Sequence, residues 1–135
     1  MVFLERLGFY FHTVFDLAAD PFHLAILFGS VLLGIIFGAM PGLTSTLGVA
    51  LLTALTYGMD TETAMLCLLS IYVGGTYGGS YASILINIPG TAASAATALD
   101  GYPLALKGEG GRAIGLTTTS SAIGTLISML FVVSI

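Results

Sequence analysis

An apolar run interrupted by one Pro-Gly pair occupies residues 71–94, IYVGGTYGGSYASILINIPGTAAS. Proline removes a backbone donor and glycine relaxes the backbone, so Pro89-Gly90 predicts an interruption between two helical segments. A second pair, Pro41-Gly42, lies upstream in another apolar run. Non-helical backbone at membrane depth persists only where protein buries it or water reaches it, so two such breaks suggest a binding site.

The composition outside this run is that of an integral membrane protein. Charged residues make up 7% of the 135 residues and hydrophobic residues 56%, with three basic side chains and a net charge of −4. Such high hydrophobicity and low charge exclude a disordered chain and argue against a soluble globule. Three basic residues cannot form a nucleic-acid interface. One cysteine, Cys67, excludes an internal disulfide, and no cluster with metal-ligand spacing occurs, so we expect no metal site.

Charge-free runs mark the expected membrane segments, which lie at 21–59, 63–99 and 113–135. A bilayer core needs about 20 helical residues. We therefore predict an all-α, polytopic membrane protein with two Pro-Gly-broken segments, discontinuous or re-entrant. The expected elements of this single transmembrane domain are an interfacial helix at 1–20, membrane helices at 22–40, 43–59, 63–88 and 113–135, a half-helix at 91–99 and a polar loop at 100–112.

Both breaks are followed by hydroxyl residues at the expected start of a new helix. Such a start exposes free N–H groups and the positive end of the helix dipole, so it can hold an anion without lysine or arginine. The alternative is that the hydroxyls only cap their own helices. The first interpretation makes these residues candidates for substrate binding: Pro41, Gly42, Thr44, Ser45, Thr46, Pro89, Gly90 and Thr91.

Four glycines within 74–79 permit very close approach by another backbone or by a ligand, and helix packing alone would also explain them. On the ligand interpretation, the substrate candidates extend to Tyr77, Gly78, Gly79 and Ser80. Asn87 is the sole amide side chain in the chain. Because it stands beside a break, we take it, with Ser80, as a candidate ligand for a coupling ion; the alternative is a hydrogen bond to a neighbouring helix. No nucleophile motif surrounds Ser80, so we expect no enzyme and no catalytic residue.

Three runs resemble the TctA family, the large membrane subunit of bacterial tripartite tricarboxylate transporters. They are GAMPGLTSTLGVALL at 38–52, IYVGGTYGGSYASILINIPGTAASAATALDGYPLA at 71–105 and the GRAIGL that follows. The family's Pro-Gly motifs fall on Pro41-Gly42 and Pro89-Gly90. Its glycine-tyrosine motif falls on 74–80, and its asparagine on Asn87.

The resemblance implies a secondary transporter in the bacterial inner membrane that takes up citrate-like or other organic carboxylates. It implies a cation gradient of Na⁺ or H⁺ as the driving force and no other cofactor. The implied partners are a periplasmic substrate-binding protein and a small membrane subunit, within the lipid bilayer. Members of the family are several times longer, so the chain is similar to their first portion. The alternative reading is a truncated membrane interaction protein that does not transport.

Overall fold

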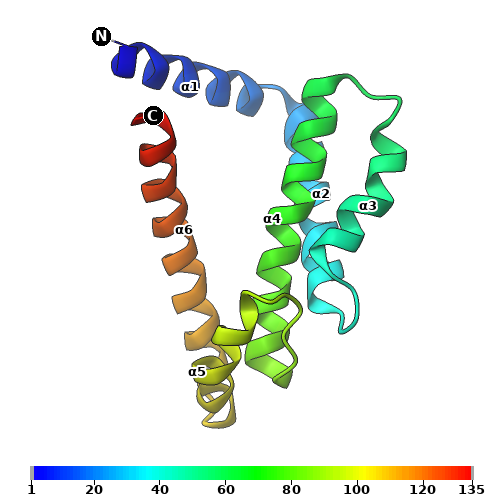
Figure 1. The fold of residues 1–135 in the computed structure, drawn as a ribbon, viewed down its shortest axis with the longest axis vertical. Coiled ribbons are helices and arrows are strands. Elements are labelled where there is room, and N and C mark those ends of the chain that lie inside the picture. The colour runs from blue at the N-terminus through cyan, green and yellow to red at the C-terminus, as the bar shows by residue number, and fades with distance from the viewer. Residues whose placement is uncertain (1, 135) are drawn as a thin grey trace.

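The fold is described from a computed structural model that covers residues 2–134. Within this range the chain is all-helical, with six helices and no strand. Figure 1 shows their arrangement: α2 and α4 run side by side, α3 and α5 pack beside them, and α6 diverges from α4 toward the end where α1 lies. The helices are α1 (Val2–Ala19), α2 (Pro21–Ala39), α3 (Ser45–Thr56), α4 (Thr61–Ile86), α5 (Ser94–Leu106) and α6 (Gly110–Ser134).

The two central helices begin at aspartate caps. Asp20 accepts a hydrogen bond from Phe22 N–H at 2.9 Å, and Pro21 occupies the first helical position, where its missing N–H costs nothing. Asp60 accepts from Thr63 N–H at 3.0 Å and starts α4 in the same way. Short-range signals in the sequence therefore determine where the closely packed helices α2 and α4 begin.

Two helices in the described range are long and apolar enough to cross a membrane. They are α2, with a mean hydropathy of 2.2, and Gly110–Val132 of α6, with a mean hydropathy of 1.4. The third helix, α3, has 12 residues, or about 18 Å of length. A hydrocarbon core is about 30 Å thick, so α3 alone cannot cross it. The expected membrane helix at 43–59 is therefore too long: the helix covers 45–56.

The expected polar loop at 100–112 is wrong. Residues 100–106 belong to α5, although Pro103 lies inside that helix. Packing holds them there, since Gly101 is buried and a Cβ atom added to it would meet Ile84 of α4. The link to α6 is only 107–109. It closes with a Schellman motif, in which Glu109 N–H donates to Leu104 O at 2.9 Å and Gly108 adopts a φ of +82°.

The same packing shifts the expected half-helix at 91–99, which the structure places at 94–106. Pro41 and Gly42 lie in the link between α2 and α3, and Pro89 and Gly90 lie in the link between α4 and α5. Both links fall toward the same end of the α2–α4 pair (Figure 1).

Candidate functional site

The site is built on a glycine-lined crossing of α2 and α4. A Cβ atom added at Gly34 would meet Ile71 O of α4, and one added at Gly38 would meet Gly75 O. From the other side, a Cβ at Gly78 would meet Ile35 O of α2. Only glycine allows two backbones to approach this closely. The packing interpretation of the glycine-rich segment therefore holds for Gly78.

The first link places Ser45 on this crossing. Thr44 caps α3 by accepting from Leu47 N–H at 3.2 Å. The next residue, Ser45, is 3% exposed and packs against Gly75, where an added Cβ would lie 2.9 Å from the serine Oγ. Ser45 Oγ is buried and has no hydrogen-bond partner in the part of the chain that the structure describes. Burying a hydroxyl without a partner is costly, which makes Ser45 the candidate in this region for contact with a ligand.

The second link approaches the same crossing one turn further along α4. Gly90 lies against Gly38 O and against Gly79, whose Cα would be 2.7 Å from a Cβ at Gly90. Here the polar groups satisfy one another. Ser94 N–H donates to Thr91 Oγ1 at 3.2 Å, and Thr91 N–H donates to Ser94 Oγ at 3.0 Å. This reciprocal pair closes the turn at residues 91–94 that leads into α5, whose N-cap residue Ala93 has no side-chain cap.

A cavity of about 360 Å³ joins the two links. Its walls are the start of α3 and residues 91–93, which immediately precede α5, and Tyr72 and Thr76 of α4 close it from the side. The volume falls within the range of small-molecule sites. The full set of lining residues is Thr44, Ser45, Thr46, Tyr72, Thr76, Thr91, Ala92 and Ala93.

The electrostatics of this cavity favour an anion. Two helix N-termini border it, and each carries about half a positive charge from its free N–H groups. The first turns of α3 and α5 contain no acidic side chain among the described residues. Neither does the described lining include an aspartate or a glutamate, so no protein carboxylate neutralises these helix ends.

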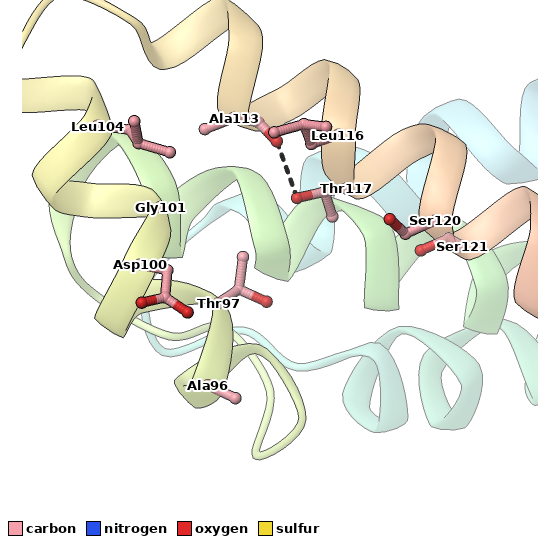
Figure 2. Close-up of a pocket in the computed structure, with 10 residues that line it drawn as sticks. All are labelled: Ala96, Thr97, Asp100, Gly101, Leu104, Ala113, Leu116, Thr117, Ser120 and Ser121. Atoms are coloured by element: carbon pink, nitrogen blue, oxygen red, sulfur yellow. Dashed lines mark hydrogen bonds between the residues drawn. The ribbon is translucent and has the colours of Figure 1, made fainter.

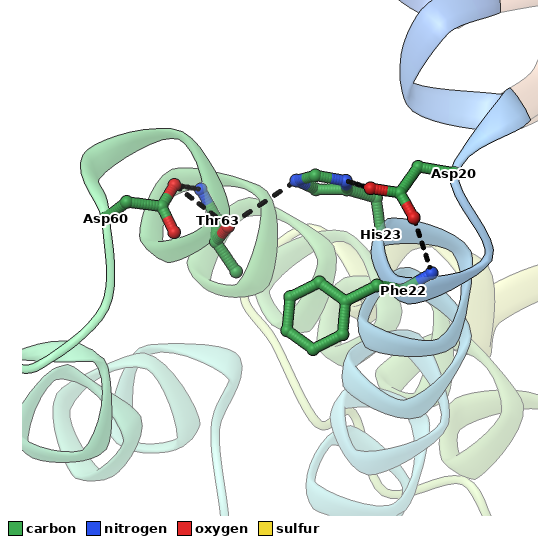
Figure 3. A network of polar contacts seen from close by, with 5 residues as sticks. All are labelled: Asp20, Phe22, His23, Asp60 and Thr63. Carbon is green, nitrogen blue, oxygen red and sulfur yellow. Dashed lines mark hydrogen bonds and ion pairs between the residues drawn. The ribbon is translucent and has the colours of Figure 1, made fainter.

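The starts of α2 and α4 are different, because carboxylates already occupy them (Figure 3). Hydrogen bonds from Phe22 N–H, then from His23, hold the pKa of Asp20 below its ordinary value of 3.8. Hydrogen bonds from the N–H and then the hydroxyl of Thr63 lower the pKa of Asp60 in the same direction. His23 joins the two caps, with Nδ1 2.8 Å from Asp20 Oδ2 and Nε2 3.5 Å from Thr63 Oγ1.

The remaining predicted site residues do not all meet at this cavity. Tyr77 and Ser80 line a second cavity of about 430 Å³ between α4 and α6, which shares Tyr72 and Thr76 with the first. Asn87 is exposed at the C-cap of α4, with a φ of +57°, and lines neither cavity. Asparagine tolerates this left-handed conformation, which gives Asn87 a role in ending the helix.

Pro41, Gly42 and Pro89 are exposed in the links and line neither cavity, so they shape the chain rather than the walls. Sequence reasoning missed Tyr72 and Thr76, which both cavities share. Their spacing of four residues places them on one helix face, a signal that the glycines between them obscured.

The described chain is all-helical, with two helices long and apolar enough to cross a membrane and a polar cavity beside the two Pro-Gly links. The chain belongs to the tripartite tricarboxylate transporter TctA family, whose sequence pattern matches residues 24–135. This family consists of transporter subunits and not of enzymes.

A curated relative from Agrobacterium vitis is 38% identical over 116 residues, which cover 86% of this chain and 23% of the relative. That protein is described only as an uncharacterized 52.8 kDa protein in the TAR-I ttuC′ 3′ region. The chain thus spans about a quarter of the length of the curated relative it matches. No solved structure matches the chain.

Proposed function

We propose that the chain forms a substrate-binding part of a secondary transporter that takes up organic carboxylates of the citrate type. In this proposal a Na⁺ or H⁺ gradient drives uptake across the bacterial inner membrane. A periplasmic binding protein delivers the substrate, and a small membrane subunit accompanies the chain. Membership of the TctA family supports the transporter class, and the cavity between α3 and α5 supports the carboxylate.

The observation that carries the proposal is the unpartnered hydroxyl of Ser45. Ser45 lines a cavity that two helix N-termini border, and the described lining of that cavity contains no carboxylate. Two helix ends contribute about half a charge each, or about one positive charge together. This sum matches one carboxylate group, so the cavity would hold one carboxylate of the substrate while its other groups lie outside.

The two Pro-Gly links give this site its place in an alternating-access mechanism. We treat α2–α3 and α4–α5 as discontinuous segments of a multi-pass protein, with their breaks at membrane depth. Discontinuous helices whose N-termini point at an anionic substrate group are a recurring device of secondary transporters. The tightly packed α2–α4 crossing supplies a rigid support, against which the shorter α3 and α5 can shift.

The test is uptake of labelled citrate by cells that carry the complete transport system. Ser45→Ala removes the free hydroxyl, and we expect uptake at low substrate concentration to fall about tenfold or more, since a hydrogen bond to a charged group contributes about 1.5–3 kcal/mol. Thr53→Ala is the matched control. Thr53 lies on the same helix, its hydroxyl donates to Val49 O at 2.8 Å, and it does not line the cavity.

Competition by unlabelled mono-, di- and tricarboxylates would identify the substrate. Equal uptake by Ser45→Ala and Thr53→Ala, at equal amounts of protein in the membrane, would show that Ser45 only packs. A wild-type chain that associates with its partner subunits but supports no uptake of any carboxylate would overturn the proposed function itself.

A further inference from the structure

The hydroxyl groups that line the cavity between α3 and α5 differ in the hydrogen bonds they already make. Thr44 Oγ1 accepts a hydrogen bond from Leu47 N–H at 3.2 Å, and Thr91 Oγ1 accepts one from Ser94 N–H at 3.2 Å. Within the described chain, neither of these two threonine hydroxyls donates to another protein atom. Each therefore keeps its hydrogen and can donate it to a carboxylate, as the unpartnered hydroxyl of Ser45 can.

Thr76, on the α4 side of the same cavity, makes the reverse kind of bond. Its hydroxyl donates to Tyr72 O, four residues earlier in the helix, at 2.9 Å. Threonine inside a helix regularly makes this bond, so a ligand does not need to displace it. A hydroxyl has one hydrogen and two lone pairs. The half-buried Thr76 therefore offers the cavity an acceptor and not a donor.

The cavity thus has donors at the helix starts and an acceptor on α4. A carboxylate only accepts hydrogen bonds, so it fits the helix starts and leaves Thr76 without a partner. A ligand that satisfies both sides must carry a hydrogen-bond donor as well as a carboxylate. Two helix ends supply about one positive charge, which disfavours an ammonium group as that donor. A neutral hydroxyl group meets both conditions.

We propose that Thr76 determines the specificity of the carboxylate site by accepting a hydrogen bond from a hydroxyl group of the substrate. Hydroxycarboxylates would then bind more tightly than carboxylates of the same skeleton without the hydroxyl, because the latter leave Thr76 without a donor. The inference rests on the proposed carboxylate site and adds the group that distinguishes one carboxylate from another.

Two other hydroxyls of the cavity do not discriminate in this way. Thr46 and Tyr72 are exposed, and their side chains make no hydrogen bond within the described chain. A free hydroxyl rotates to donate or to accept, so it suits a substrate with or without a hydroxyl group. The bond to the α4 backbone is what fixes the polarity of Thr76.

The cavity between α5 and α6 has the same kind of acceptor without the donors (Figure 2). There the hydroxyl of Thr117 donates to Ala113 O of its own helix at 3.0 Å. This cavity, of about 330 Å³, is also lined by the carboxylate of Asp100. A fixed negative charge repels a substrate carboxylate. An acceptor inside a helix therefore contributes to hydroxycarboxylate binding only where helix starts lie beside it, as they do at Thr76.

The experiment measures equilibrium binding of two ligands to the purified complete transporter. They are citrate and propane-1,2,3-tricarboxylate, which is citrate without its hydroxyl group. We expect the wild type to bind citrate about three- to tenfold more tightly, the effect of one hydrogen bond between neutral groups. Thr76→Val removes the hydroxyl and keeps the branched shape. It should lower the affinity for citrate to that for the analogue and leave the affinity for the analogue unchanged.

Two further variants separate recognition from packing. Thr53→Val is the matched control, because the hydroxyl of Thr53 makes the same kind of bond, to Val49 O at 2.8 Å, and does not line the cavity. It should keep the wild-type preference for citrate. Thr76→Ser retains the oxygen atom and should keep the preference as well. If Thr76→Val fails to fold, Thr76→Ala replaces it with the same expected loss of preference.

Equal binding of the two ligands by the wild type would overturn the inference. So would a Thr76→Val variant that binds both ligands more weakly by the same factor, since Thr76 would then only pack. Both of these outcomes would leave the carboxylate site standing, because both ligands still bind. A complete transporter that binds neither ligand would overturn the proposed function and the inference together.

Discussion

The starts of α2 and α4 differ from those of α3 and α5 in the group that occupies the positive end of the helix dipole. α2 and α4 begin at Asp20 and Asp60, so the protein's own carboxylates occupy their free N–H groups. α3 begins at the neutral cap Thr44, and α5 begins after Ala93, which supplies no side-chain cap and no charge. Because a helix dipole attracts any anion, the first pair is filled by the protein and the second remains open to a ligand.

The largest effect is expected when an acidic residue is placed at the N-cap of α3. Thr44→Asp preserves a favourable N-cap, so the fold should survive. A charge about 6 Å from a bound carboxylate, at an effective dielectric constant of about 20, repels it by about 3 kcal/mol. We expect carboxylate binding to weaken about 100-fold, measured by equilibrium binding of citrate to the purified transporter.

The reciprocal substitution is the control for this change. Asp60→Thr exchanges a charged cap for a neutral one at a helix start that does not border the cavity. Citrate should bind this variant as it binds the wild type. Equal weakening by both substitutions would mean that net charge, and not the local helix end, controls binding.

Gly38→Ala tests the crossing of α2 and α4, which brings the starts of α3 and α5 close together. The added methyl group would meet Gly75 O, and Gly90 also packs against the Gly38 backbone. Overpacking against backbone atoms should lower the free energy of unfolding by about 2 kcal/mol or more. Thermal unfolding in detergent would show the loss. Gly29→Ala, on the same helix with no atom within 4 Å of the new methyl group, should leave the melting temperature unchanged or slightly raised.

A smaller effect is expected to distinguish the start of α5 from the start of α3. Ser94→Ala removes both the acceptor of Thr91 N–H and the donor to Thr91 O, so it should destabilise the start of α5 by about 1 kcal/mol. Because this hydroxyl is already satisfied, citrate affinity should change far less than in Ser45→Ala. A loss of affinity in Ser94→Ala that equals the loss in Ser45→Ala would remove the distinction between the two links.

The smallest effect concerns pH. The folded-state pKa values of Asp20 and Asp60 lie below 3.8, so their stabilising effect is complete above that pH and is lost as the pH falls through the depressed values. Amide hydrogen exchange at Phe22 and Thr63 should therefore accelerate under strongly acidic conditions, after correction for the intrinsic pH dependence. Protection at Leu47, whose cap is the neutral Thr44, should not respond.

Much of the fold was predictable because its signals are local. Pro-Gly pairs, N-caps and long apolar runs place the helices to within a few residues at both ends of α2 and α4. The error at 100–112 arose because Asp100, Lys107 and Pro103 read as a loop, whereas burial of Gly101 against Ile84 keeps this segment helical. Packing between helices overrides such composition, and the sequence does not display it.

The site was predictable in its parts and not in its assembly. Hydroxyls after each break and the positive ends of new helices follow from residue types alone, as does the absence of basic side chains near them. That Ser45 is the unpartnered hydroxyl and Thr91 a satisfied one is decided by neighbours, since Ser94 reaches Thr91 and the described chain offers Ser45 no such partner.

The sequence by itself determined the membrane class, the family and the positions of the two breaks, because hydropathy and backbone chemistry act over a few neighbouring residues. Only the tertiary structure decided that both breaks meet on one face of α4, that Tyr77 and Ser80 turn toward α6, and that Asp100 lines a cavity. These outcomes depend on the close approach of α2 and α4 at their glycines, and an approach between distant segments is a property of the packed chain.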